Sequence, residues 1–223
     1  MTTATIPAHT ATGVLGDLAA AYGLTARLVL APADRSLLRE LSESGVLDRW
    51  AMCPSSETIR GISSLRRSLA VGEDLAMLAA EYDRLFTDGL SLVPLPYESA
   101  YRPAESPLSD LPVVPTLGTP HLFGLQDPPS SRRDDGCLEC DHLGLELLRA
   151  GRLCLAASEA FEHGDAVTSA ECLVAHHDLL ERHLLRWAPG CLREVEAAAD
   201  TQFYRGWAAL GLGVLGHAHT RLP

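Results

Sequence analysis

Apolar residues recur at intervals of three and four along most of this chain, and no stretch alternates convincingly with period two. Leucine and alanine dominate, while β-branched residues are sparse, and this balance favours helix over strand. The sequence therefore predicts an all-α bundle of about eight helices. The clearest stripes are Leu143, Leu147, Ala150, Cys154, Ala157 and Phe161, and then Leu192, Val195, Ala199, Phe203, Gly206, Leu210 and Val214.

Helix caps and breakers set the expected boundaries in the N-terminal half. A first helix is expected over residues 13–31, because Pro32 stops it. Asp34 is a candidate N-cap for a second helix, and Ser55 or Ser56 for a third.

The same signals set the expected boundaries in the C-terminal half. Asp141 is the candidate N-cap of the next helix, and Thr168 or Ser169 starts the one after it. On that second helix we expect an apolar face that includes His177 and ends at Trp187. Pro189-Gly190 is expected to break it.

Prolines concentrate in one window of the chain. Nine of the fourteen lie between Pro94 and Pro129, where each proline pushes the residue before it away from the helical region. We therefore expect a linker or an extended arm there. The predicted organisation, within one domain overall, is a flexible N-terminus (1–12), an N-terminal helical half (13–102), a Pro-rich linker (103–136) and a C-terminal helical half (137–223).

The charge balance narrows the classes of partner. The formal net charge is -11, and the acidic excess concentrates between Asp134 and Asp200. An acidic face repels nucleic acid and anionic lipid, so we expect neither partner. No run approaches the ~18 apolar residues of a membrane span, and the first residues lack the pattern of a secretory signal peptide. These features predict a cytoplasmic protein without stable membrane insertion.

Cys137, Cys140 and His142 form the sharpest chemical pattern. A Cys-x-x-Cys pair with a nearby histidine can supply three ligands to one zinc ion. A structural site needs four ligands, however, and no second Cys-x-x-Cys occurs. A redox dithiol would lack its usual βαβ context. A metal- or thiol-based function therefore remains one alternative. The other is that these thiols have no special role. No phosphate loop, dinucleotide fingerprint or Gly-x-Ser-x-Gly is found, so we expect no enzyme.

The stretch from Tyr82 to Tyr101 has the character of a binding surface. A helix ends near Leu85-Phe86, and Pro96-Tyr97-Glu98-Ser99 then combines an extended backbone with amphipathic tyrosines and a carboxylate that can pair with arginine. The alternative is structural: Leu85 and Phe86 pack in the core, and the following loop covers it while its glutamate caps a neighbour. Asp141-His142 opens the next helix and is expected to lie beside this stretch.

Four blocks of the sequence resemble the TorD/DmsD/NarJ family of molybdoenzyme maturation chaperones, the redox enzyme maturation proteins. The blocks are Glu81–Phe86, Pro96–Tyr101, Asp141–Leu147, and His183–Pro189 followed by Phe203-Tyr204. The resemblance implies a TorD-like all-α fold with a Pro-rich hinge between its halves. It implies a cytoplasmic chaperone, monomeric or dimeric, that binds an apo-molybdoenzyme catalytic subunit or its twin-arginine signal peptide. Such a chaperone aids insertion of the molybdenum cofactor and delays export until maturation.

The resemblance also implies a client-binding site without a permanently bound cofactor, touched at most transiently by the client's molybdopterin. Glu98 and Asp141 would receive the arginines of the client, and Leu85, Phe86 and Tyr97 its apolar part. Glu139-Cys140 departs from the Glu-Pro or similar pair that usually precedes Asp-His in the family. The residues carried over to this site are Leu85, Phe86, Pro96, Tyr97, Glu98, Ser99, Asp141, His142 and Glu146.

Overall fold

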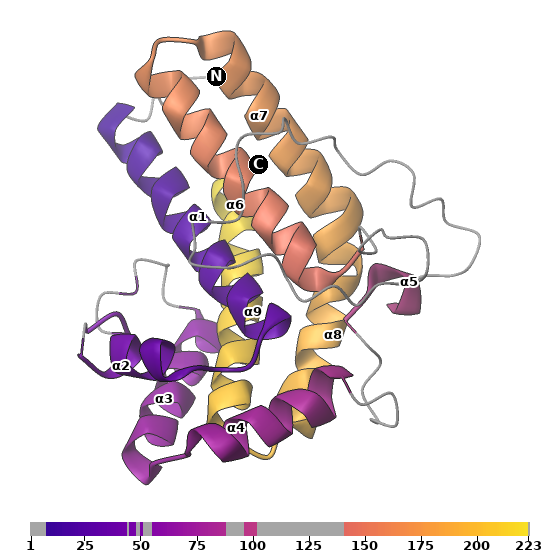
Figure 1. Ribbon diagram of the computed structural model, residues 1–223. Coiled ribbons are helices and arrows are strands. Elements are labelled where there is room, and N and C mark those ends of the chain that lie inside the picture. The colour runs from indigo at the N-terminus through magenta and orange to yellow at the C-terminus, as the bar shows by residue number, and fades with distance from the viewer. Residues whose placement is uncertain are drawn as a thin grey trace.

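The computed structural model describes residues 8–43, 45–47, 50, 55–87, 96–101 and 141–222. Within these ranges the regular elements are helices, and the strand-like pairing is one isolated antiparallel bridge between Tyr97 and His142 (Figure 1). The predicted all-α class is confirmed. The predicted Pro-rich linker (103–136) lies outside the described residues, and so do Cys137 and Cys140.

The helices follow one another along the chain with π-helical turns at two junctions. In order they are α1 (Ala8–Leu30), α2 (Arg35–Glu43), α3 (Ser56–Val71), α4 (Leu75–Tyr82), the π-helical turn η1 (Asp83–Thr87), α5 (Glu98–Tyr101), α6 (Leu143–Glu162), α7 (Ala166–Leu179), the π-helical turn η3 (Leu180–Leu184), α8 (Leu185–Ala198) and α9 (Gln202–Arg221).

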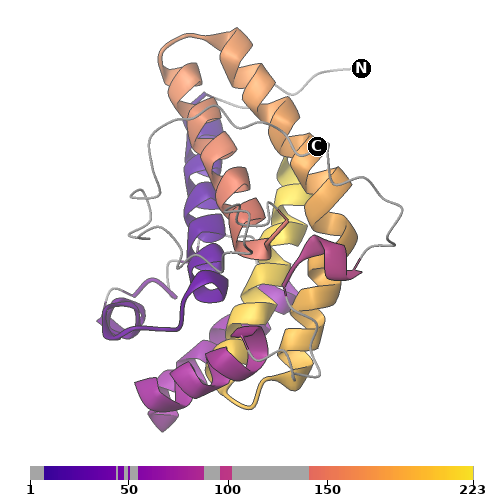
Figure 2. The same cartoon turned by 45° about the vertical axis from the view of Figure 1, so that its right-hand side comes forward.

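Helix α9 is the centre of the bundle. It packs against α3, α8 and α1, and α1 packs along α6, which forms an antiparallel hairpin with α7 (Figures 1 and 2). Phe203, Tyr204 and Trp207 on α9 are almost completely buried. Two helices from the first part of the chain, α1 and α3, therefore bury their apolar faces against helices from the last part, and both parts contribute to one core.

Two glycines let α3 and α9 approach closely. A Cβ atom at Gly61 would lie 2.8 Å from the Gly206 carbonyl oxygen, and one at Gly206 would lie 2.8 Å from the Gly61 carbonyl oxygen. No larger residue fits at such a backbone contact without moving one of the helices. The pair therefore fixes the crossing point that holds α3 on the central helix.

The apolar character of α1 departs from the sequence expectation. Its residues Thr12–Leu30 are long and apolar enough, by length and composition, to cross a membrane, although no stretch was expected to approach such a span. In the bundle, 56% of this window is buried, and the helix packs on α6 and α9. Its composition is that of a helix at the centre of a folded core.

Two predicted N-caps in the first half are confirmed. Asp34 accepts the Leu37 amide at 2.7 Å, and Ser55 accepts the Thr58 amide at 3.1 Å. Helix α1 starts at Ala8, upstream of the predicted start at residue 13.

Three boundary predictions in the second half are wrong. His142, not Asp141, caps α6, because its Nδ1 accepts the Gly144 amide at 3.1 Å. Asp165, not Thr168 or Ser169, caps α7. Helix α8 continues through Pro189 to Ala198. Pro189 lies at the start of the second turn of α8, which follows the π-helical turn η3, and the chain breaks only before Thr201, the N-cap of α9.

The predicted buried face of α7 is also wrong by one residue. His177 is exposed, whereas His176 is completely buried together with Cys172 and Leu179. The prediction placed His177 and Trp187 on one face of a single helix with an unbroken 3.6-residue period. Because η3 inserts a π-helical turn between α7 and α8, the apolar phase upstream of it is displaced.

Candidate functional site

Residues 96–101, here called the strap, lie against the start of α6. The Leu143 amide donates to the Pro96 carbonyl oxygen, and the Glu98 amide to the Asp141 carbonyl oxygen, both at 2.9 Å. The Asp141 carboxylate accepts the Ser99 amide at 3.0 Å. The strap and Asp141-His142 are therefore neighbours, as expected. Within residues 96–101 the backbone does not stay extended after Tyr97, since Glu98–Tyr101 forms the short helix α5 (Figure 2).

Tyr97 and His142 meet at the isolated bridge. Their rings contact edge to face, with centroids 5.0 Å apart. His142 Nδ1 accepts the Gly144 amide, so the proton of the neutral imidazole is on Nε2. Burial lowers the pKa of His142 to about 4. His142 is therefore an uncharged cap at neutral pH, and the partly exposed Tyr97 ring covers it.

Glu98 points inward from the strap. Its side chain is fully buried, and His183 Nδ1 in η3 donates to its carboxylate at 2.9 Å. The Asp141 side chain is 4% exposed. The two carboxylates expected to receive arginines are thus both engaged inside the protein in this conformation. A group from outside the protein could reach them only if the strap moved.

Glu146 on α6 is a third buried carboxyl group at this site. Its Oε2 accepts the indole N–H of Trp187 at 3.3 Å, while its Oε1 is buried without a hydrogen-bond partner. Burial raises the pKa of Glu146 well above its usual value, and the negative charge of Glu98 raises it further. Both effects favour the protonated, neutral form of Glu146.

Tyr101 closes the other end of the strap. Its ring lies 5.6 Å from that of Trp187, and its hydroxyl donates to Glu194 at 2.7 Å. His183 and Trp187 hold two of the three carboxyl groups, yet sequence reasoning did not assign them to the site. Their spacing of four within the block His183–Pro189 places them on one helical face, and this signal could have identified them.

Leu85 and Phe86 lie in the core. Leu85 is fully buried in η1, and the Phe86 ring packs on those of Tyr204 and Trp207 at 5.9 and 5.6 Å. This burial matches the structural alternative for the two residues. Tyr82, which precedes them, donates to the Val29 carbonyl oxygen at 3.1 Å, and so ties this corner to the end of α1.

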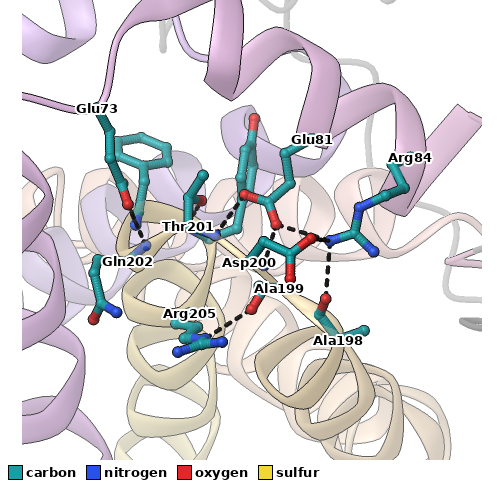
Figure 3. A network of polar contacts seen from close by, with 11 residues as sticks. Glu73, Glu81, Arg84, Ala198, Ala199, Asp200, Thr201, Gln202 and Arg205 are labelled. Atoms are coloured by element: carbon teal, nitrogen blue, oxygen red, sulfur yellow. Dashed lines mark hydrogen bonds and ion pairs between the residues drawn. The ribbon is translucent and has the colours of Figure 1, made fainter.

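A polar network fixes the position of α4 and η1 over α9 (Figure 3). Glu81 accepts the Thr201 amide at 2.9 Å and pairs with Arg84 at 2.9 Å. Glu73 accepts the amides of Gln202 and Phe203 at 2.7 and 3.0 Å. These carboxylates satisfy the free N–H groups at the start of α9 and complement its dipole. The network is structural, and it anchors the turn that carries Leu85 and Phe86.

The metal hypothesis remains untested. Cys137 and Cys140 lie outside the described residues, and among the described ones no group of three or more His, Cys, Asp or Glu side chains could hold a metal ion. Cys154 and Cys191 are buried, and burial raises the pKa of each thiol to about 12. Such thiols stay protonated and unreactive.

Comparison with known proteins gives one match. A family model described as nitrate reductase delta subunit matches residues 55–193, more than half of the chain. No curated protein and no solved structure matches. The matched range starts at the N-cap of α3 and ends within α8, so it contains the strap, Glu146, His183 and Trp187. The chain therefore belongs to the nitrate reductase delta subunit family, the NarJ/TorD type of maturation chaperone.

Proposed function

We propose that this protein is a cytoplasmic maturation chaperone that binds the catalytic subunit of a molybdoenzyme. It holds the twin-arginine signal peptide of that client at the strap site, and it releases the peptide for export after the molybdenum cofactor has been inserted. Family membership supports the chaperone role. The protein performs no chemistry of its own in this proposal, and it meets the client's molybdopterin only transiently.

The observation that carries the peptide-binding part is that Glu98 of the strap lies close to Asp141 and Glu146, and that one oxygen of Glu146 lacks a partner. A buried polar atom without a hydrogen bond is rare in native proteins. A guanidinium group presents a planar fork of N–H donors that fits a carboxylate with two acceptor oxygens. An arginine that entered here would supply the missing partner.

Binding requires the strap to leave α6, because all three carboxyl groups are covered by it or by its neighbours. Glu98 then exchanges His183 for a guanidinium, and Asp141 exchanges the Ser99 amide for another. Tyr97 and His142 offer ring surface to the apolar part of the peptide, with Pro96 next to Tyr97 in the strap. Two adjacent arginines can then pair with these two carboxylates, one on the strap and one at the start of α6.

The loss of a proton from Glu146 would be a second sign of arginine binding. In the free protein, burial raises the pKa of this carboxyl group and so favours its neutral form. A guanidinium next to it favours the charged form. Peptide binding at neutral pH should therefore release protons to the buffer, up to about one per site.

Calorimetry with the signal peptide of the molybdoenzyme that co-purifies from cells grown without oxygen tests the proposal. We expect Glu98→Gln combined with Asp141→Asn to weaken binding at least about tenfold, since charge-assisted hydrogen bonds are lost. Repeating the titration in phosphate and in Tris reports proton release, which Glu146→Gln should abolish. A peptide with Lys-Lys in place of Arg-Arg should bind more weakly, because it lacks the guanidinium fork.

The matched control is Glu73→Gln. It makes the same change in a carboxylate that accepts two backbone amides, but at the start of α9. This variant should keep the wild-type affinity. Unchanged affinity in the Glu98→Gln/Asp141→Asn variant would remove these residues from the peptide site. If the catalytic subunit still co-purified with that variant, the chaperone role would stand and only the site would be wrong.

A further inference from the structure

A cavity of about 510 Å³ lies between α3, α8 and α9, and it shares no lining residue with the strap site. Leu185 and Pro189 on α8, together with Leu212 and Leu215 on α9, give it apolar surface. Its volume is in the range of cavities that hold small organic ligands, which are roughly 300–1,000 Å³.

A glycine leaves space at the α9 side of this cavity. A Cβ atom added at Gly216 would meet nothing within 4 Å. At Gly213, which also lines the cavity, a Cβ would clash with the Thr58 hydroxyl oxygen. Gly213 is thus explained by packing against α3, whereas Gly216 is exposed and has open space beside it. A ligand can lie directly against the α9 backbone at Gly216.

Among the charged side chains that line the cavity, one arginine, Arg193, has no carboxylate partner in the described residues. Arg60 and Glu196 form a bidentate ion pair, with N–O distances of 3.1 and 3.2 Å, so their charges neutralise each other. Glu57 accepts a hydrogen bond from Ser56 at the positive start of α3. Arg193 has, among the described residues, only a 3.4 Å bond to the Pro189 carbonyl oxygen.

His217 adds an unsatisfied polar atom to the same lining. Its Nδ1 is covered and has no hydrogen-bond partner within the described part of the chain. Burial lowers the pKa of His217, and Arg221 lowers it further, so the ring is neutral at physiological pH. A neutral imidazole nitrogen of this kind can donate or accept one hydrogen bond. The cavity therefore combines an unpaired guanidinium, an imidazole and apolar walls.

We propose that this cavity binds a small organic anion with a flat apolar body and one carboxylate, sulfonate or phosphate group. The Arg193 guanidinium pairs with the anionic group, and the His217 residue contributes to the wall against which the ligand lies. The apolar body lies between Leu185 and Leu212, over Gly216. This site is separate from the strap, and it does not depend on the client peptide.

Fluorescence titration with anilinonaphthalene sulfonate, a fused aromatic ring bearing one sulfonate, tests the proposal. We expect one saturable site per chain in the wild type. Gly216→Leu should weaken binding at least about tenfold, because the leucine side chain fills the space that the ring would occupy. Arg193→Gln should weaken binding about tenfold through loss of the charge-assisted bond. N-phenylnaphthylamine, the uncharged analogue, should bind wild type and Arg193→Gln equally.

Two matched controls locate the binding. Gly13→Leu makes the same substitution at an exposed helical glycine with equally open surroundings, outside the cavity lining. Val174→Ser removes one of the exposed apolar side chains of α7, where the probe could also adsorb. Both variants should bind like the wild type.

Wild-type binding in Gly216→Leu, or loss of binding in Val174→Ser, would overturn the proposal. Equal loss for the charged and the uncharged probe in Arg193→Gln would contradict the assigned pairing. Thermal unfolding of each variant shows that it is folded. Should Gly216→Leu fail to fold, the exposed Arg193→Gln carries the test alone: unchanged affinity for the sulfonate there would refute the site.

Discussion

His176 shows how a single buried residue couples stability to pH. It is completely buried on α7, and its Nε2 lies 3.2 Å from the Tyr22 hydroxyl. Burial lowers the pKa of His176 to about 4, whereas a histidine in an unfolded chain titrates near 6.5. The unfolded state therefore binds this proton first as the pH falls. The stability that neutral His176 provides is complete above about pH 6.5, and it is lost progressively toward pH 4.

His176→Gln should reduce this acid sensitivity. Glutamine can retain the hydrogen bond to Tyr22 and cannot take up a proton in this range. Between pH 6.5 and 4.5 the free energy of unfolding should fall less steeply than in the wild type, by roughly 2 kcal/mol over the interval. Urea unfolding at several pH values measures this slope. His177→Gln, at the exposed neighbour, should keep the wild-type slope; equal slopes in all three proteins would exclude His176 as the cause.

Glu146 has the opposite effect on the pH dependence of stability. The pKa of its carboxyl group is raised in the folded state, so the stability linked to it is fully present below about pH 4.5, the usual value, and is lost as the pH rises through the folded value. Glu146→Gln stays neutral at every pH and can still accept from Trp187. We therefore expect this variant to be as stable as the wild type at pH 7.5, or more stable, in urea unfolding. A marked loss would mean that the carboxyl group has a partner essential for folding.

At the scale of whole elements, the crossing of α3 and α9 depends on Gly61 and Gly206. Gly61→Ala would place a methyl group 2.8 Å from the Gly206 carbonyl oxygen and force the helices apart. We expect a loss of about 1–3 kcal/mol in the free energy of unfolding. Gly16→Ala on α1, where a Cβ meets nothing within 4 Å, should instead be neutral or gain up to about 1 kcal/mol. In thermal melts, the midpoint should therefore fall for Gly61→Ala and stay unchanged or rise for Gly16→Ala.

The sequence predicts helices well where local signals and packing agree. Asp34 and Ser55 each place a side-chain oxygen at the start of an apolar helical period, and both are caps. The stripe from Leu192 to Val214 is buried throughout. This stripe is not one helix, however, because the chain turns a corner between α8 and α9. The capping residues Asp200-Thr201 could have indicated that corner.

The failures come from non-local effects. Pro189 lies inside a helix. The buried face of α7 is displaced to His176, because the π-helical turn η3 changes the register between α7 and α8. Nothing in local composition specifies such a turn. For the candidate site, sequence placed the strap beside Asp141-His142 but could not show that Glu98 turns inward, because its partner His183 is 85 residues away.

At the scale of the whole molecule, the two parts of the chain complete one core. Helix α1 packs on α6, and α3 packs on α9, so neither part can bury its apolar surface alone. Cleavage at a protease site inserted between residues 101 and 141 should leave the two pieces associated. They should elute together in gel filtration and melt in a single transition. Separation of the pieces after cleavage would show that each folds independently.

The position of the strap also determines how fast a client can be captured. If Glu98, Asp141 and Glu146 become accessible only after residues 96–101 leave α6, peptide association has a unimolecular step that no excess of peptide can accelerate. In stopped-flow mixing, the observed rate should rise with peptide concentration and then level off at the opening rate. Tyr101→Phe removes the hydroxyl bond to Glu194 and should raise that plateau. The chaperone would then capture its client at a pace set by its own opening, however much client is being synthesised.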